Sequence, residues 1–283
     1  MDADSLLYRR RKLTDWLVRS ACALAAGIAL VPLALVLYYV TARGLGGLSW
    51  DFLTKLPTPV GEPHGGMANA IVGSLEMVGL AGLFGIPPGI LAGIYLAEFG
   101  DNRLASAVRF AADVMSGIPS ITVGMFVYAV VVLANKQFSA VAGAIALAVL
   151  MLPTVTRTTE ELLRLVPTTL REAALGLGVS RWRATLGVVL RTAAPGIATG
   201  VMLAVARVAG ETAPLLFTAL NNRFWPQGLM EPTASLPVQI YTYAISPFPE
   251  WHEQAWAAAL VLVVLILLLN VTARLVVRNR VRS

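Results

Sequence analysis

The sequence predicts an all-α polytopic membrane protein with six transmembrane helices. Of its 283 residues, 57% are hydrophobic and only 13% are charged, whereas soluble domains carry about 25% charged residues. Five uncharged stretches reach or approach the roughly 18 to 20 residues that cross a bilayer, and a sixth does so if it accommodates two charges. The six stretches are residues 21–40, 77–97, 114–135, 138–156, 196–220 and 255–273.

The first stretch follows the basic residues 9–12 and is predicted to be an uncleaved helix. It is longer than the roughly 7 to 15 apolar residues of a signal-peptide core, and no small-x-small cleavage site closes it. We therefore expect a basic N-terminal segment, 1–15, and a single transmembrane domain, 16–283. A cleaved signal peptide is the alternative.

Proline and glycine are predicted to bend the second and third helices. Pro87 and Pro88 each remove a backbone donor from the second helix, and Gly117 and Pro119 interrupt the start of the third. The turn between the third and fourth helices is short, which favours a hairpin. Outer loops are predicted at 41–66 and 221–254.

The distribution of Lys and Arg predicts the orientation in the membrane. With the N-terminus in the cytoplasm, seventeen basic residues lie on that side and four lie in the outer loops. This bias follows the positive-inside rule, so we expect both termini of this multi-pass protein to be cytoplasmic. Topology and anionic membrane lipid then explain the net charge of +6 without nucleic acid.

Several kinds of site are not expected in this chain. Cys22 is the only cysteine, and His64 and His252 lie far apart, so the pattern predicts neither a disulfide framework nor a metal site. The three lysines form no G-x-x-x-x-G-K-[ST] phosphate loop. The predicted spans contain neither a Ser/His dyad nor paired aspartates, so an intramembrane enzyme is not expected either. We therefore expect no catalytic residue and no cofactor.

The segment at 157–194 is predicted to be a cytoplasmic loop with two short helices, because it is charged but regularly patterned. Thr169 and Glu172 fit a capping box at the start of the first helix. Gly178 fits the left-handed residue that ends it, and Ser180 can cap the second helix.

Ala173 and Ala174 are predicted to form a docking surface, because small side chains let another protein approach the helix backbone closely. The alternative is that Glu172 only caps the helix and the alanines only favour it.

The fifth span carries two charges, Arg207 and Glu211, in an otherwise apolar run. Counted from residue 196 at about 1.5 Å per residue, Arg207 lies roughly 17 Å into the membrane, where an unpaired charge costs at least about 2.5–3.5 kcal/mol. Residues four apart share a helix face and can pair, so we expect the pair to face a polar pathway. A guanidinium matches phosphate oxygens bidentately. An ion pair that only fixes helix packing is the alternative.

Gly210 and Pro214 predict a hinge beside these charges, because Pro214 cannot donate to the carbonyl of Gly210 in a continuous helix. A static kink is the alternative. At the start of the third span, Asp113 is predicted to pair with Arg109, and Ser116 can bond to a backbone carbonyl.

The inner loop resembles the EAA signature of binding-protein-dependent ABC-importer permeases. In EAALGLG, four residues stand at the E-A-A-x-x-x-G positions: Glu172, Ala173, Ala174 and Gly178. The resemblance implies a type I ABC-importer permease fold, in which this coupling-helix loop inserts into a groove on a cytoplasmic ATPase. The sequence departs from the pattern at Arg191, where proline is common.

Three longer motifs are similar to those of phosphate-importer permeases of the PstA type: ADVMSGIPSITVGMFVY, ARVAGETAPLLFTALNNRFW and LPVQIYTYAISPFPEW. The resemblance runs from about the second helix to the C-terminus. It implies an importer of inorganic phosphate in which this chain pairs with a second, homologous permease subunit. Two copies of an ATPase, which bind ATP and magnesium, and an external phosphate-binding protein complete the system.

In this family the charged residues of the fifth span are linked to phosphate passage. The resemblance therefore implies a substrate pathway with the following candidates: Arg207, Glu211, Thr212, Asp113 and Ser116. A secondary anion transporter or channel that acts without an ATPase is the opposing hypothesis. The number of spans and the docking-shaped inner loop favour ATP-driven import.

Overall fold

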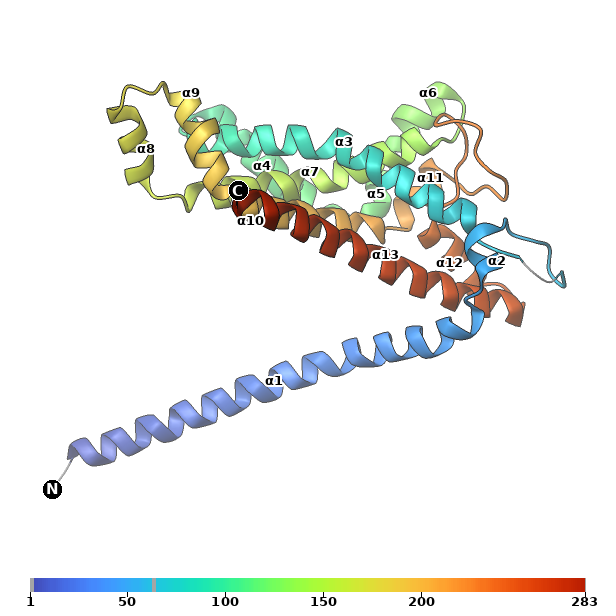
Figure 1. The fold of residues 1–283 in the computed structure, drawn as a ribbon, viewed down its shortest axis with the longest axis horizontal. Helices are drawn as coiled ribbons and strands as arrows, with labels where there is room; N and C mark the ends of the chain where they lie inside the picture. Colours follow the sequence, from blue (N-terminus) through green and yellow to red (C-terminus); the bar gives the residue numbers. More distant parts are fainter. Residues whose placement is uncertain (1–2, 63–64, 283) are drawn as a thin grey trace.

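The computed structural model describes residues 3–62 and 65–282, and every regular element within them is helical (Figure 1). Among the described residues, five helices are long and apolar enough to cross a membrane, and there are up to six spans if one bent pair of helices is counted as a crossing. The predicted all-α polytopic fold is therefore confirmed. The helices are α1 (Ala3–Gly47), α2 (Trp50–Thr54), α3 (Ala68–Glu98), α4 (Arg103–Gly117), α5 (Ser120–Val127), α6 (Leu133–Asn135), α7 (Ala140–Arg164), α8 (Thr168–Gly176), α9 (Arg181–Ala184), α10 (Leu190–Ala209), α11 (Ala213–Thr218), α12 (Leu236–Ala244) and α13 (Pro249–Arg282), with π-helical turns η1 (Tyr128–Val132) and η2 (Thr185–Val189).

Helix α1 is continuous from the basic N-terminal segment through the first span, and it runs away from the other helices (Figure 1). It packs on α13 near its C-terminal end, where a Cβ atom on Gly44 would lie 2.7 Å from the Cβ of Leu260. Most of its large apolar side chains are exposed in this chain. Helix α1 therefore presents an apolar surface that lipid or another subunit covers in a membrane.

Helices α3 and α7 pack closely because glycines line their contact. Gly85, Gly89 and Gly93 are four residues apart and share one face of α3. A Cβ atom on Gly89 would lie 2.8 Å from Cγ1 of Val155, and one on Gly93 would lie 2.5 Å from Cβ of Thr159. Small residues of this kind let membrane helices approach each other closely, so α3 and α7 form the packed centre of the bundle.

The predicted proline bends have different outcomes in the second and third spans. Helix α3 remains one helix through Pro87 and Pro88. The third span breaks at Ile118 and Pro119, and the segments before and after the break meet at 106°. Helix α4 therefore departs from the direction of α5 and packs against α7.

The fifth span is also broken. The helical segment Arg181–Ala209 ends before Gly210, and α11 begins at Ala213. Pro214 lies in the first turn of α11, where its missing N–H is tolerated, and not inside a continuous helix as the sequence predicted. A Cβ atom on Gly124 of α5 would lie 2.6 Å from Cα of Pro214, so the start of α11 is packed tightly on α5.

The bundle has two ends, which we call the α8 end and the α12 end. The α8 end comprises α8, α9 and the last turns of α3 and α7, with Leu163 and Val189 in its core. The α12 end comprises α2, α12 and the first turns of α3 and α13, with Phe52 and Leu236 buried. Helix α12 lies within the loop predicted at 221–254, and α13 begins at Pro249, earlier than the predicted sixth span.

Candidate functional site

The break in the fifth span holds the two charges that the sequence singled out. Arg207 lies in the last turn of α10 and is exposed, whereas Glu211 and Thr212 are partly buried between α10 and α11. Because α10 ends before Gly210, Arg207 and Glu211 do not lie on one continuous helix. No hydrogen bond or ion pair joins them in the described part of the chain, so the predicted pair is wrong.

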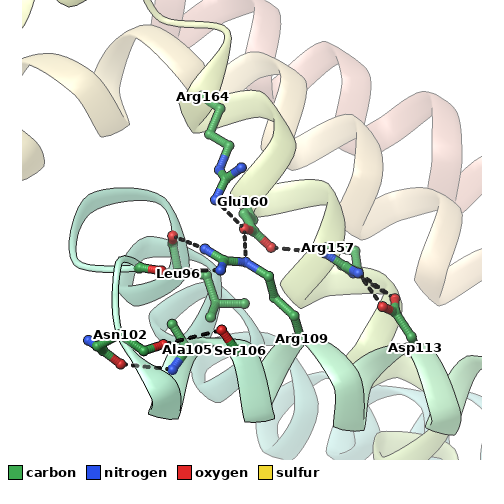
Figure 2. Close-up of polar contacts among 10 residues, drawn as sticks. Leu96, Asn102, Ala105, Ser106, Arg109, Asp113, Arg157, Glu160 and Arg164 are labelled. Carbon is green, nitrogen blue, oxygen red and sulfur yellow. Dashed lines mark hydrogen bonds and ion pairs between the residues drawn. The ribbon is translucent and has the colours of Figure 1, made fainter.

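Figure 2 shows a charged cluster around Glu160 of α7, at the α8 end. The Glu160 side chain is only 3% exposed and accepts a 2.7 Å hydrogen bond from Nε of Arg109. Its carboxylate also lies 2.9 Å from Nη2 of Arg164 and 3.3 Å from Nη1 of Arg157. A buried carboxylate is strongly destabilising unless it is paired, and here three guanidinium groups compensate its charge.

Arg109 connects three helices through this cluster. It lies on α4, pairs with Glu160 of α7, and donates to two carbonyl oxygens at the C-terminal end of α3 (Figure 2). These bonds run from Nη1 to Gly100 at 3.1 Å and from Nη2 to Leu96 at 2.9 Å. Cations near a helix C-terminus stabilise its unsatisfied carbonyl groups, so Arg109 fixes α4 against both α3 and α7.

Asp113 pairs with Arg157, and not with Arg109 as the sequence predicted. Nε of Arg157 donates to Oδ1 of Asp113 at 2.9 Å, and the Asp113 side chain is 58% exposed (Figure 2). The helical spacing favoured a local pair, but the buried Glu160 takes Arg109 instead. Ser116 donates to the carbonyl of Ala112 at 2.9 Å, which satisfies its hydroxyl within α4.

A second buried carboxylate, Glu98, ends α3 and binds Arg171 of α8, with Nε and Oε1 3.0 Å apart. Neither Glu98 nor Glu160 was predicted from the sequence to have a role. The available signal was their position, since each stands just beyond a predicted apolar stretch, one ending at 97 and the other at 156. Arg109 and Arg171 entered the prediction of membrane orientation as basic residues of the cytoplasmic side, whereas in the structure their side chains are largely buried.

Helix α8 occupies the position of the predicted docking loop. It begins at Thr168 with Pro167 as its N-cap and no side-chain capping bond, so the predicted capping box of Thr169 and Glu172 is wrong. Gly178 has φ +79°, which confirms the predicted left-handed residue after the helix. Ser180 precedes α9, but its side chain makes no capping bond, and α9 continues through η2 into α10.

The two alanines of the loop differ in exposure. Glu172, Ala173 and Gly178 are exposed, whereas Ala174 is only 7% exposed and packs into the protein. The expectation that both alanines are available for docking therefore needs correction, because only Ala173 is exposed. The neighbouring Leu177, which is 84% exposed, adds apolar area to this surface.

Comparison with known proteins defines the class. Residues 89–282 match the family described as binding-protein-dependent transport system inner membrane component. The chain belongs to this family, and it is therefore a multi-pass inner membrane permease component whose ATPase lies in a partner subunit. Membership in this family supports the hypothesis of a binding-protein-dependent importer permease over that of a secondary transporter or channel.

Within this family, the chain is similar to phosphate transport permeases. It is 46% identical over 270 residues to the phosphate transport system permease protein PstA of Yersinia pestis, covering 95% of this chain and 91% of that protein. The PstA protein of Haemophilus influenzae is 44% identical over 277 residues, 98% of each chain. A probable PstA protein of the archaeon Methanocaldococcus jannaschii is 37% identical over 256 residues, 90% of each chain.

Solved structures show the same fold. A chain of the MetNI methionine ABC transporter, solved in inward-facing conformations, matches with a TM-score of 0.64 at 19% identity, covering 75% of this chain and 95% of that one. A chain of a bacterial transporter that imports the acidic polysaccharide alginate matches with a TM-score of 0.54 at 16% identity, covering 96% and 98%. The predicted ABC-importer permease fold is therefore confirmed.

Proposed function

We propose that this chain is one permease subunit of an ATP-driven importer of inorganic phosphate. The observation that carries the proposal is its identity of 44–46% with phosphate transport permeases over at least 95% of the chain. Similarity over nearly the whole length includes the spans as well as the loops, so it extends to the parts that would contact a substrate.

Arg207 is the residue proposed to contact phosphate. Its side chain is exposed beside a break in the fifth span, and no carboxylate within the described residues pairs with it. A guanidinium stays charged at every physiological pH and forms two parallel hydrogen bonds with phosphate oxygens. Glu211 and Thr212 lie in the same break, and we assign them to the pathway with Arg207.

The break also supports a hinge. Helix α10 ends at Ala209 and α11 begins at Ala213. Between them, the backbone N–H groups of Gly210 and Glu211 donate to carbonyls three residues back, as in a turn, and so the α-helical bonding pattern is interrupted. We propose that α10 and α11 change their mutual angle here during transport. Asp113 and Ser116 are exposed on α4 and are proposed as pathway residues nearer the α8 end.

Helix α8 is proposed to couple this movement to the ATPase. Glu172, Ala173 and Gly178 would face the ATPase, and Ala174 would hold α8 on its support. In this proposal the α8 end and both termini are cytoplasmic, and residues 157–194 include the coupling loop. The segment 1–15 carries basic charge, and residues 16–283 form the permease domain.

The remaining partners follow from this arrangement. A second, homologous permease would complete the pathway, and two copies of the ATPase would bind ATP and magnesium. An external phosphate-binding protein would dock at the α12 end, where the loops at 41–66 and 221–254 lie.

Reconstitution of the chain with these partners in liposomes tests the function. We expect phosphate uptake that requires ATP inside and the binding protein outside, and that excess sulfate does not inhibit. Uptake without ATP would support the secondary transporter instead.

Replacement of the exposed alanine tests the docking surface. We expect Ala173→Trp to reduce co-purification of the ATPase at least about tenfold, since one misfitting aromatic group in an interface costs more than about 1.4 kcal/mol. Co-purification is measured by affinity capture of this chain from detergent extracts. Glu161→Gln, an exposed change on α7, is the control. Wild-type capture by Ala173→Trp would place the ATPase interface elsewhere.

A further inference from the structure

Glu98 joins three helices at the α8 end. It is the last residue of α3, and its side chain is only 5% exposed. Oε1 of Glu98 accepts from Nε of Arg171 on α8, and Oε2 lies 3.4 Å from the hydroxyl of Thr185 in η2. The backbone carbonyl of Glu98 accepts from Arg181 of α9, whose guanidinium also stacks over Phe99 with 4.8 Å to the ring centroid.

Arg171 uses the rest of its guanidinium on the end of α7. Nη1 donates to the carbonyl of Val166 and Nη2 to that of Leu163, both at 2.6 Å. Arg171 thus bonds to one carbonyl in the last turn of α7 and to one just beyond it, while it neutralises the buried Glu98. One side chain of α8 therefore contacts both helices of the packed α3–α7 pair.

The rest of α8 has little other support from the bundle. Its main packing partners are α9 and η2, which begin the helical segment of the fifth span, and Ala174 is its one buried residue. A force applied to the exposed face of α8 therefore reaches both α3 and α7 directly through the Arg171 guanidinium. It also reaches α3 through Arg181 of α9 and Thr185 of η2, which contact Glu98. A charge-assisted hydrogen bond such as that of Arg171 holds a side chain more firmly than a neutral hydrogen bond does.

We propose that Glu98 and Arg171 are positioning residues that transmit the movement of α8 to α3 and α7. This inference rests on the proposed function, in which α8 contacts the ATPase. Neither residue touches substrate or nucleotide in this proposal. Their role is to make the loop and the central helix pair move together, so that ATP hydrolysis and opening of the pathway occur in step.

Hydrogen exchange tests the position of α8 without reference to any substrate. The complete transporter complex in lipid nanodiscs would be compared in wild-type form and as Glu98→Gln, Arg171→Met and the double variant. We expect exchange in residues 165–180 to accelerate roughly tenfold in each variant, because charge-assisted bonds are lost, while residues 140–156 keep their rates. Exchange in the double variant should be no faster than in the faster of the two single variants, since both substitutions break the same contact between Glu98 and Arg171.

Two further variants guard this test against misfolding. Arg171→Lys keeps the charge but loses the planar fork, and it should give an intermediate acceleration even if the larger changes prevent assembly. Glu161→Gln removes an exposed carboxylate one turn from the end of α7 and should leave the exchange unchanged. Wild-type exchange of 165–180 in all Glu98 and Arg171 variants would overturn the proposal.

Transport measurements then test the consequence. We expect Glu98→Gln and Arg171→Met to keep the ATPase bound and its basal turnover within about twofold, but to take up roughly tenfold less phosphate per ATP hydrolysed. A purely structural role would instead lower ATPase capture and uptake together. An unchanged ratio of uptake to hydrolysis would also overturn the proposal. If the wild-type complex transports no phosphate, the proposed function is wrong, and the exchange result still decides whether the two residues position α8.

Discussion

Arginine side chains are used in two different ways in this protein. At the α8 end, Arg109 and Arg171 lie mostly buried, and each pairs with a buried carboxylate and caps the end of a helix. In the fifth span, Arg207 lies beside a helix break, exposed and without a carboxylate partner among the described residues.

The difference separates structural arginines from a candidate ligand-binding arginine. A buried guanidinium with a full set of acceptors stabilises the fold, and its loss leaves a charged partner unpaired. An arginine with no acceptor in the protein adds little to stability, yet placing it within a membrane span is unfavourable. Its presence is explained if an anion supplies the missing partner.

The largest expected effect is at Arg207. Arg207→Glu should reduce phosphate uptake to background, because the reversed charge repels the anion, while the thermal stability of the purified chain stays the same. Uptake is measured with radioactive phosphate in proteoliposomes that hold the complete transporter. Arg103→Gln, a change at an exposed arginine of α4, is the control. Normal uptake by Arg207→Glu would remove the distinction between the two kinds of arginine.

The next effect is at the centre of the paired cluster. Glu160→Ala should lower the free energy of unfolding by about 3–5 kcal/mol, because it leaves Arg109 buried without its partner. Unfolding in mixed micelles, followed by circular dichroism, measures the change. Glu161→Ala, on the exposed side of the same helix, should change stability by less than about 0.5 kcal/mol. Equal stabilities for the two variants would mean that the cluster does not hold the α8 end together.

The smallest effect is at the exposed edge of the same cluster. Asp113→Asn should change the free energy of unfolding by less than about 1 kcal/mol, since solvent screens exposed ion pairs and the Asp113 side chain is 58% exposed. Uptake measured in parallel sharpens the comparison. A stable variant with strongly reduced uptake places Asp113 in the pathway with Arg207, whereas normal uptake makes it a minor structural residue.

Much of the fold could be predicted from the sequence because membrane spans are defined by run length. The uncharged stretches at 77–97 and 255–273 lie within single long helices, and the stretch at 138–156 is helical from residue 140 onward. Local backbone signals were also readable: Pro119 breaks the third span, and Gly178 takes the left-handed conformation. These features depend on a few neighbouring residues, so one sequence is enough to find them.

The charged contacts could not be predicted in the same way. Helical spacing suggested that Arg109 pairs with Asp113, but Arg109 pairs with Glu160, which is 51 residues away. Such pairs depend on how α4 is laid against α7, and the bend at 106° decides that geometry. The predicted pairing of Arg207 with Glu211 was wrong for a related reason. It assumed one continuous helix, whereas α10 ends at Ala209 and the next helix begins only at Ala213.

Helix α3 is one continuous helix of 31 residues, about 46 Å at 1.5 Å per residue, which is longer than the roughly 30 Å hydrocarbon core of a bilayer. Glu98 stands at one extremity, and near the other the hydroxyl of Ser74 accepts a 2.7 Å hydrogen bond from the backbone N–H of Leu236, the first residue of α12. We therefore expect a tilt of α3 at Glu98 to shift α12 at the other end of the bundle. Movement at the α8 end would then reach the α12 end through the backbone of α3, without a chain of rearranging side chains.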